Sequence, residues 1–587
     1  MKKYLFLAIA LLGLAACAKD DIADGNKPIH NGEIEESYIA INLSASDITR
    51  AETTTPEFED GEAAERAVNH VDFFFFDANG NPFGVTGNPA VAPGTGVNHL
   101  RAANVKFSAD TNTGDDISDT STPVLLLRTY KGQYPSQIVA VLNWSPDNKT
   151  SYSLNDLYAA VNITGKFNET DYFVMSNAVY ASSDGKTVNA ATLPENSIKK
   201  TEAEAKDAPI SIYVERVAAK VTVSAKDNKD VIDLNKPVKP VGGEAVNVYA
   251  KLLGWELHND IPQSYLLKQI TPTWTSDDIG FNWNDTPWYR SYWATSLPLP
   301  QPSPVTNSFQ MEYEKDKDDK YPAGFTTEYG FAMGDATYVG ENTNGTNDEG
   351  EKQGTKVILK AQLVKKIDET TYEPIEIASW YGNQYVGEEN LLIAVANTLK
   401  YTLFYYDTAN SKYIGITPED LQCVAGGTTD APEGVAANEV YFQLSKESGL
   451  GESRSDGWYK LVDGVYKPVA DNLNPDKYSV DATNEYLAEY VKPGILYTGG
   501  ETFYYVDIKH LGASGSVAEY GVVRNHIYNV IIKSIGGYGS PVYVGTSDII
   551  DPKYPDTPDA KDSFVSAQIN ILSWRLVNQE VDIQPQN

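Results

Sequence analysis

The sequence predicts a mainly β protein made of two β-sandwich domains with a few short helices. Three observations lead to this fold class. Many short segments alternate apolar and polar residues, turn-forming residues separate these segments, and the composition includes 38 tyrosines, 44 glycines and 31 prolines. With 587 residues the chain is long enough for two domains with separate cores. We find no fixed-period repeat.

Charge and cysteine content narrow the classes of function. The formal net charge of −33 argues against a nucleic-acid partner, because phosphates require a basic surface. The two cysteines are Cys17 and Cys423. Cys17 ends a predicted leader, so the folded chain would keep a single thiol, with no internal disulfide and no cysteine cluster. We interpret Cys423 as a small buried apolar residue rather than a nucleophile.

Residues 1–17 have the features of a secretory signal peptide. Two lysines precede the apolar run Tyr4–Leu14, which is too short to span a bilayer. The sequence Leu14-Ala15-Ala16-Cys17 resembles the lipobox of bacterial lipoproteins, in which the cysteine is acylated. A plain signal peptide with an incidental cysteine is the alternative. No second apolar stretch approaches about 20 residues, so we expect an anchor made of lipid alone.

Residues 18–50 form a predicted propeptide that contains a polar tether and one strand. In Tyr38–Ala45 the residues Ile39, Ile41 and Leu43 share one face, as in a half-buried strand. Arg50 follows, and 51–61 is polar and contains proline, the kind of loop in which proteases cut. Cleavage between Arg50 and Ala51 would release lipid, tether and strand together. An unprocessed loop is the alternative.

Residues 51–212 form the predicted N-terminal β-sandwich domain. The predicted strands are Val71–Asp77, Val124–Leu127, Ile138–Leu142, Tyr172–Ser176 and Ile210–Val214. The first leads into the hairpin signal Asn79-Gly80. The runs beginning at Val124 and Ile138 suit strands that are buried on both faces. Ser153–Val161 is predicted to be a helix with Ser153 as its N-cap.

Residues 213–562 form the predicted C-terminal β-sandwich domain. Its predicted strands include Val214–Ser224, Ala250–His258, Val357–Leu363, Thr402–Tyr406 and Ile527–Ile532. The last is apolar except for Asn529, so we expect it at the centre of a sheet. Gly340–Gly354 is polar, and we expect it to be an exposed loop.

No catalytic or metal-binding constellation is visible. The six histidines lack the spacing of zinc ligands, and no nucleophile elbow, phosphate loop or dinucleotide fingerprint occurs. Asp77, Asn79 and Gly80 faintly resemble a calcium loop, but the acidic twelfth ligand is missing, so a hairpin is favoured. His526 lies within a predicted strand, and we interpret it as a packed or edge residue. We therefore predict a protein without enzymatic activity, metal or cofactor.

Residues 563–587 form a predicted C-terminal strand region. Val565, Ala567, Ile569 and Ile571 alternate with polar residues, and the apolar phase then shifts to Trp574 and Leu576. It shifts again at Val577, Val581 and Ile583, and such shifts predict a bend or bulge near Leu572-Ser573. We predict that Phe564–Ile571 completes the second domain of its own chain. Ser573–Ile583 would then pair with another subunit.

Four segments carry a resemblance to a known family. They are the lipobox at Cys17, VERVAAKVTV at Val214–Val223, VVRNHIYNVIIKSI at Val522–Ile535 and FVSAQINILSWRLVNQEVDI at Phe564–Ile583. The chain resembles the fimbrillins of Bacteroidales, the type V pilins, and among them the Mfa-type major shaft subunit. The resemblance implies two transthyretin-like Greek-key sandwiches. It also implies a palmitate-bearing outer-membrane lipoprotein precursor that an arginine-specific or trypsin-like protease cleaves after Arg50.

The resemblance further implies assembly by donor-strand exchange. Loss of the strand that carries Ile39, Ile41 and Leu43 leaves a groove, and a neighbouring subunit fills it with its own C-terminal strand. The donor residues would be Trp574, Leu576, Val577, Val581 and Ile583. Strand addition satisfies an exposed sheet edge, and head-to-tail contacts that do not close produce a filament. The implied product is an extracellular fimbrium with anchor and tip subunits that supports cell adhesion and biofilm formation.

Two other functions remain open. A surface glycan-binding lipoprotein is suggested by Trp274, Trp283, Trp288 and Trp293, because dense aromatic side chains can stack on sugar rings. A tip or anchor subunit of the same fimbrium is the other. An anchor should lack a cleavable Arg50 and a tip need not carry a terminal donor strand, so both features together favour a shaft subunit.

Overall fold

The structure is a computed structural model of the chain. It describes residues 33–45, 62–87, 96–103, 108–109, 119–121, 123–147, 149–167, 170–181, 187–240, 243–270, 294–299, 331–345, 353–426, 431–436, 439–446, 457–470, 473, 479–510, 514–541, 564–573 and 576–578. The predicted mainly β fold class is confirmed, with many strands and few, short helices. The Greek-key detail stays a prediction.

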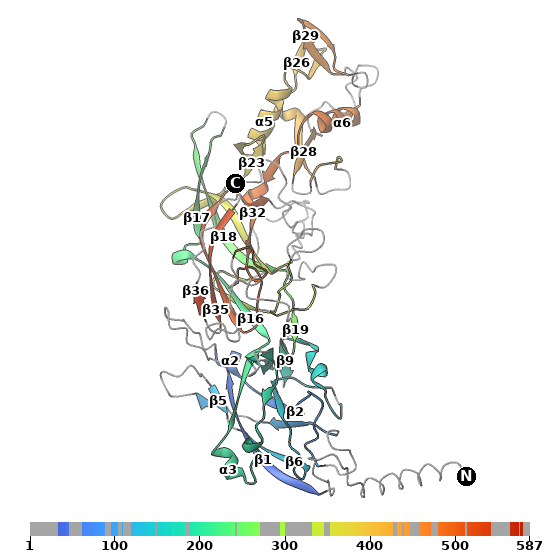
Figure 1. Cartoon of the computed structure of the whole chain (residues 1–587). Helices are drawn as coiled ribbons and strands as arrows, with labels where there is room; N and C mark the ends of the chain where they lie inside the picture. Colours follow the sequence, from blue (N-terminus) through green and yellow to red (C-terminus); the bar gives the residue numbers. More distant parts are fainter. Residues whose placement is uncertain are drawn as a thin grey trace, which may run out of the picture.

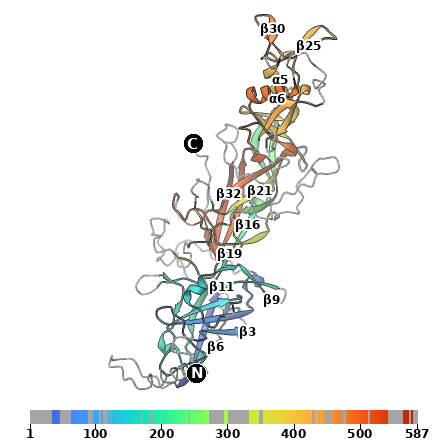
Figure 2. The same ribbon diagram turned by 90° about the vertical axis from the view of Figure 1, so that its right-hand side faces the viewer.

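The described residues form an elongated molecule with three parts arranged end to end (Figures 1 and 2). We call them the N-terminal part (33–216), the middle part (218–376 with 498–578) and the distal part (377–497). Each part has a hydrophobic cluster of its own, and the clusters include a few residues of the neighbouring part at each boundary. The distal part lies within the predicted second domain, and the sequence analysis did not anticipate its separate core. The division between residues 212 and 213 stays a prediction.

A ten-stranded sheet dominates the N-terminal part. Its order is β3 (His99–Ala103), β2 (His70–Phe76), β7 (Gln137–Leu142), β11 (Met175–Asn177), β15 (Ile210–Arg216), β1 (Ile34–Ala45), β5 (Asp119–Ser121) and β4 (Ser108–Ala109), with β14 (Ala191–Thr192) on β7 and β6 (Val124–Tyr130) on β1. Other elements are α2 (Ala63–Arg66), η1 (Leu154–Tyr158), β8 (Ala160–Asn162), β9 (Thr164–Phe167), β10 (Thr170–Phe173), β12 (Tyr180–Ala181), β13 (Thr187–Val188), η2 (Glu195–Ser197) and α3 (Glu202–Lys206).

The predictions for this part hold unevenly. β7 is buried on both faces as expected, whereas β6 alternates, so the prediction that both runs are buried on both faces is wrong for β6. The helix predicted over Ser153–Val161 is also wrong. Ser153 and Asp156 do form a capping box, but the helix is the short 3₁₀ turn η1, and β8 follows it at once. Pairing of β8 with β19 (Gln263–Tyr265) in the middle part replaces the last helical turn.

The segment after β2 is a turn, in keeping with the favoured hairpin. The Asp77 carboxylate accepts hydrogen bonds from the backbone N–H groups of Asn79 and Asn81, each at 2.8 Å. Gly80 has φ +78°, a conformation that glycine adopts at low cost. The chain then returns along β2, where the Phe83 N–H donates to the Phe75 carbonyl.

The middle part is a sandwich of two sheets. One has the order β20 (Ala336–Gly340), β16 (Ala218–Ala225), β33 (His526–Gly536), β35 (Phe564–Ser573) and β36 (Leu576–Asn578). The other has β17 (Val231–Val238), β18 (Val246–His258), β21 (Lys356–Lys366), β32 (Glu501–Asp507) and β34 (Ser540–Pro541), with β22 (Tyr372–Pro374) on β21; η3 (Lys226–Asn228) joins β16 to β17. Side chains of both sheets share one core. β33 is central in its sheet, as expected.

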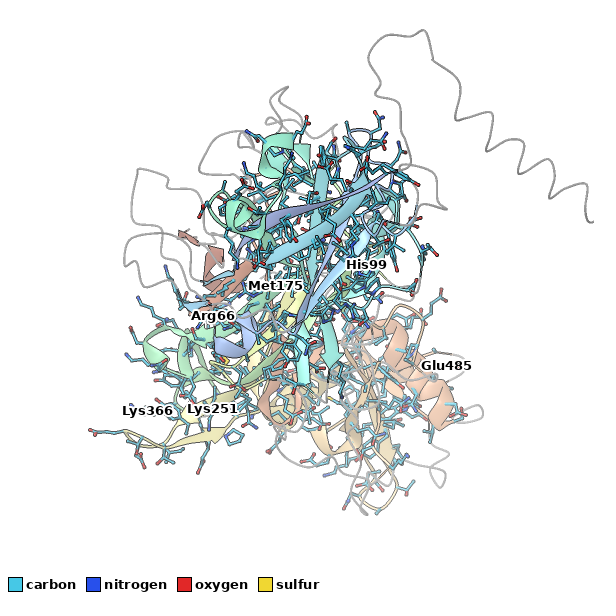
Figure 3. The ribbon with its side chains drawn as sticks, turned by 90° about the horizontal axis from the view of Figure 1, so that it is seen from below. Arg66, His99, Met175, Lys251, Lys366 and Glu485 are labelled. Atoms are coloured by element: carbon cyan, nitrogen blue, oxygen red, sulfur yellow. The ribbon has the colours of Figure 1, made fainter. Side chains whose placement is uncertain are left out.

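The distal part projects from the middle part. It contains β23 (Ile377–Trp380), β24 (Asn383–Val386), α5 (Gly387–Leu399), β25 (Phe404–Asp407), β26 (Lys412–Gly415), η6 (Pro418–Asp420), β27 (Leu421–Ala425), β28 (Val440–Leu444), β29 (Tyr459–Val462), β30 (Val465–Pro468), α6 (Val480–Tyr490) and β31 (Ile495–Tyr497), and η8 (Thr498–Gly500) follows. Seen from below, Lys251 of β18 and Lys366 of β21 lie together on one side of the molecule, and Glu485 of α6 lies on the other (Figure 3).

Candidate assembly site

β1 pairs with two strands in turn, one along its first half and another along its second half. Its first half, Ile34–Ala40, runs antiparallel to β6, and its second half, Ile41–Ala45, runs parallel to β15. β5 pairs with Leu43 and Ser44 from the side opposite β15. The backbone of Tyr38 also exchanges hydrogen bonds with Lys199, at 2.7 and 2.8 Å. Strand β1 therefore fills a slot in which its backbone is paired along the whole length, and on both sides at Tyr38, Leu43 and Ser44.

The core-facing side chains of β1 are part of the N-terminal core. Ile39 and Ile41 are fully buried and pack among apolar residues of β2, β6, β7 and β15. At about 1.5–3 kcal/mol for each buried isoleucine, these two contribute roughly 3–6 kcal/mol. Polar residues at the start of β1 and just before it make exposed contacts instead: Glu36 pairs with Arg128 at 2.9 Å, and Glu33, which precedes β1, pairs with Lys131 at 2.9 Å.

Removing β1 would uncover unpaired backbone groups on β6 and β15 together with an apolar trough. Edges of this kind attract another strand. A replacement would need alternating apolar side chains, and it would have to run parallel to β15 if it is to reproduce the pairing of β1. Without β1, this geometry would leave room for another extended segment.

The two C-terminal strands, β35 and β36, differ in how extensively they pair with the rest of their sheet. β35 pairs antiparallel with β33 along its whole length, from Phe564 opposite Gly536 to Ser573 opposite His526. β36 pairs only with β35, from Leu572 opposite Leu576 to Asn570 opposite Asn578, and it ends the order of the sheet. The chain direction reverses between Ser573 and Leu576, and β35 continues to Ser573 without an interruption at Leu572.

The structure describes some of the predicted site residues and not others. Cys17, Arg50, Ala51, Trp574, Val581 and Ile583 lie outside the described residues, as do the four tryptophans at 274, 283, 288 and 293. Leu43 lies in β1, and Leu576 and Val577 lie in β36. The roles of all these residues in processing and strand donation stay predictions.

Two of the segments that carry the resemblance meet in the structure. β16 comes from VERVAAKVTV and β33 from VVRNHIYNVIIKSI, and they run parallel, with Lys220 opposite Ile527 and Val223 opposite Val530. At the start of this pair, the Asn525 side-chain oxygen accepts from the Arg216 N–H at 3.3 Å. The two segments thus form the connection between the N-terminal and middle parts.

This connection contains buried charges that the sequence analysis missed. The Arg524 side chain, 0% exposed, pairs with Glu341 at 3.2 Å and donates to the backbone carbonyls of Tyr265 and Leu266 at 2.6 and 3.2 Å. Glu341 and Asn342 are themselves buried, so the expectation of an exposed loop over Gly340–Gly354 is wrong at its start. The reason is that Glu341 is needed to neutralise Arg524.

A second buried pair joins α2 to β16. The Glu65 carboxylate lies 2.8 Å from the Lys220 Nζ and accepts a hydrogen bond from the Tyr338 hydroxyl. Burial opposes the ionisation of Glu65, but these hydrogen bonds outweigh it and hold its pKa below the ordinary value. The same Tyr338 hydroxyl has its pKa raised by burial and by Glu65. Residues 65 and 220 thus link the N-terminal part to the middle part electrostatically.

His526 is packed rather than exposed, in keeping with its interpretation as a packed or edge residue. Its Nδ1 lies 2.7 Å from the Arg524 carbonyl oxygen, and its ring lies 5.2 Å from that of His510. Burial lowers the pKa of His526 to about 4, and burial likewise holds the pKa of His510 well below its ordinary value. Both rings are therefore neutral at pH 7.

The structure also bears on the single described thiol, on metal binding and on membrane crossing. Cys423 is a free, half-buried thiol packed against the distal core, and burial raises its pKa. Within the described residues, no group of three or more His, Cys, Asp or Glu side chains could hold a metal ion. Among the described helices, none has both the length and the apolar character that crossing a bilayer requires.

Comparison with known proteins finds a family match near the C-terminus of the chain. Residues 495–580 match the family model described as the C-terminal part of fimbrillin, a type IV major fimbrial subunit protein. The match extends from β31 through β36. The expected resemblance to fimbrillins is confirmed for these residues, and the Mfa-type subdivision stays a prediction.

Two solved structures were also matched. One is a protein of Parabacteroides distasonis ATCC 8503 described as a candidate cell adhesion protein, with 10% identity and a TM-score of 0.31 over 90% of this chain and 96% of its own. The other is a fimbrilin of Porphyromonas gingivalis W83, with 11% identity and a TM-score of 0.31 over 92% and 99%. These scores are too low to support an argument. No curated protein matches the chain.

Proposed function

We propose that this chain is a structural shaft subunit of a fimbrium that polymerises head to tail by strand exchange. The observation that carries the proposal is the position of β1. This strand precedes the predicted cleavage position at Arg50, yet it is an internal, fully paired strand of the N-terminal core. The family match at residues 495–580 supports the same class of protein.

The proposed pathway begins with export as a lipoprotein precursor acylated at Cys17 and held at the outer membrane. A protease specific for arginine cuts between Arg50 and Ala51, and β1 then has no covalent link to the rest of the subunit. Its release opens the slot between β15 and β6. The mature subunit joins an extracellular fibre that carries adhesion and biofilm functions, and anchor and tip subunits complete it.

The proposed donor is the terminal segment 573–583 of the preceding subunit. β36 is held by one neighbour and over few residues, so its detachment costs far less than detachment of β35. β35 stays in its own sheet and positions the released segment. Val581 and Ile583 are spaced like Ile39 and Ile41 of β1, so an extended segment at 581–583 would place both apolar side chains on one face. The contact is heterologous and leaves each end open, which permits a filament.

The test is polymerisation of the purified precursor after treatment with a trypsin-like protease. We expect ladders that resist SDS, because an exchanged strand is paired along its length and buried. Arg50→Ala should prevent cleavage and ladders, and truncation of Trp574–Asn587 should permit cleavage but prevent ladders. Ladders from both variants would overturn the proposal.

A further inference from the structure

The slot that β1 fills has a polar end near the start of the strand. Ser37 of β1 and Thr129 of β6 are buried, at 3% and 2% exposed. Among the described residues, neither side-chain hydroxyl has a hydrogen-bond partner. A buried hydroxyl that has given up water without a replacement partner is destabilising. β1 is therefore imperfectly matched to its own slot at this point.

Both hydroxyls lie on the core-facing side of the strand pair. β1 runs antiparallel to β6, with Ile39 opposite Leu125 and Ser37 opposite Leu127. Thr129 lies two residues beyond Leu127, so the alternation of a strand places both on the same side of β6. Ile39 and the two leucines are part of the N-terminal core. Along this side of the slot, the surroundings thus change from polar to apolar.

The two hydroxyls are too far apart to satisfy each other. Ser37 and Thr129 are diagonal neighbours on paired strands, a relation in which Cα atoms lie about 7–8 Å apart. The serine side chain is short, and it makes no hydrogen bond to the threonine hydroxyl. A longer polar side chain at the place of Ser37 would reach Thr129. A primary amide suits this position because it both donates and accepts hydrogen bonds.

We propose that Thr129 determines which strand replaces β1 and in which register it pairs. The preferred strand carries a long amide side chain at the place of Ser37. Apolar side chains follow it at alternate positions and enter the apolar stretch of the slot. The amide gives the Thr129 hydroxyl the partner that β1 does not provide. This inference rests on the proposed strand exchange and adds the residue that sets the alignment of the incoming strand.

The occupant that we assign to this site is the C-terminal segment of a second copy of the chain. β36 ends at Asn578, and Gln579 is the next residue. Val581 and Ile583 follow Gln579 at the same spacing at which the two buried isoleucines of β1 follow Ser37. The segment thus repeats the pattern of β1 with one change, an amide in place of the serine hydroxyl.

Other registers of the same segment fit the slot less well. A shift of two residues in one direction would move Gln579 to the place of Ile39 and bury its amide among apolar side chains. A shift of two residues in the other direction would place Val581 beside Thr129 and leave the hydroxyl without a partner. A shift of one residue would turn Val581 and Ile583 away from the core.

The mismatch also favours exchange in one direction. Before cleavage β1 is part of the same chain as its slot, so it fills the slot despite the unsatisfied hydroxyls. After cleavage it competes with a strand that adds a buried hydrogen bond to Thr129. The exchanged state gains this bond, and the return of β1 would lose it.

The experiment compares ladders formed by protease-treated precursors with Thr129→Val, with Gln579→Leu and with both changes. The measured quantity is the rate at which SDS-resistant ladders dissociate at one fixed temperature. Each single variant should dissociate about tenfold faster than wild type, because one buried polar group loses its partner. The double variant should recover most of this loss, because both groups are then apolar. Gln584→Leu makes the same change on the opposite face and should dissociate like wild type.

The melting temperature of the uncleaved precursor tests the starting point without polymerisation. Thr129→Val removes only a hydroxyl that has no partner while β1 is in place, so it should not lower the melting temperature. A lower melting temperature, single variants that dissociate like wild type, or no recovery in the double variant would overturn the inference and leave strand exchange intact. Absence of ladders from wild type would overturn both.

Discussion

Arg524 is the residue on which the connection between the N-terminal and middle parts depends most. Its guanidinium is fully buried and reaches Glu341 and two backbone carbonyls. A charge in such a position is stable only while each partner is present. In a fibre under tension, this network would keep neighbouring parts of one subunit from separating.

Replacement of Arg524 should be strongly destabilising. Arg524→Met leaves Glu341 buried without its counter-charge, and we expect a loss of about 3–5 kcal/mol in the free energy of unfolding. Urea unfolding measures it. The control is Arg128→Ala, which breaks a half-exposed pair with Glu36 and should cost less than about 1 kcal/mol. Equal losses in the two variants would show that the buried network has no special role.

The buried histidines predict a loss of stability in acid. The pKa of His526 is lowered from its ordinary 6.5 to about 4 by burial, so the unfolded chain takes up protons between these values and the folded chain does not. The stability from the neutral ring is complete above pH 6.5 and falls as the pH drops towards 4. Besides burial, Lys268 lowers this pKa, whereas backbone hydrogen bonds with Arg524 and Val523 raise it.

Unfolding midpoints at pH 7 and pH 4.5 test this prediction. Wild type should lose more stability across this interval than His526→Gln, which cannot titrate at this position. The same pH dependence in both proteins would exclude His526 as a source of the acid sensitivity.

Sequence reasoning identified little of this network. Glu341 and Arg524 are 183 positions apart, and Glu341 begins a segment rich in Asn, Gly and Glu that has the composition of an exposed loop. The available signal was the presence of Arg524 and His526 beside a run of apolar strand residues. Such polar groups at the start of an apolar strand indicate burial with a partner, but they do not say which acidic residue pairs with Arg524.

At the scale of elements, strands with strict alternation could be predicted well. The strand expected over Tyr38–Ala45 is β1, and the one expected over Ile527–Ile532 is the centre of β33. Ser153–Val161 failed because a pairing with distant residues, not local periodicity, decides its second half. The distal part was missed because its elements are short and only their mutual packing reveals a third core.

The alternation of the donor segment allows a matched pair of variants. Val581→Asp places a charge on the apolar face proposed to enter the slot, so we expect loss of SDS-resistant ladders after cleavage. Asp582→Asn changes the neighbouring residue on the opposite face of the same strand and should leave ladders intact. Ladders are followed on gels of boiled and unboiled samples. Retention of ladders in Val581→Asp would exclude this residue from the exchanged strand.

At the scale of the whole molecule, the proposed acceptor and the proposed donor lie on different parts of one chain. The β1 slot belongs to the N-terminal part, and β36 lies in the middle part (Figure 1). Under the proposed strand exchange, this separation would let one subunit receive a strand and donate a strand at the same time.

The most direct test of strand exchange separates the two roles. A precursor that lacks Trp574–Asn587 can accept but not donate, and an Arg50→Ala precursor can donate but not accept. When an arginine-specific protease is added to their mixture, strand exchange predicts one SDS-resistant heterodimer and no longer ladder. Absence of the heterodimer, or ladders formed by either variant alone, would contradict the account.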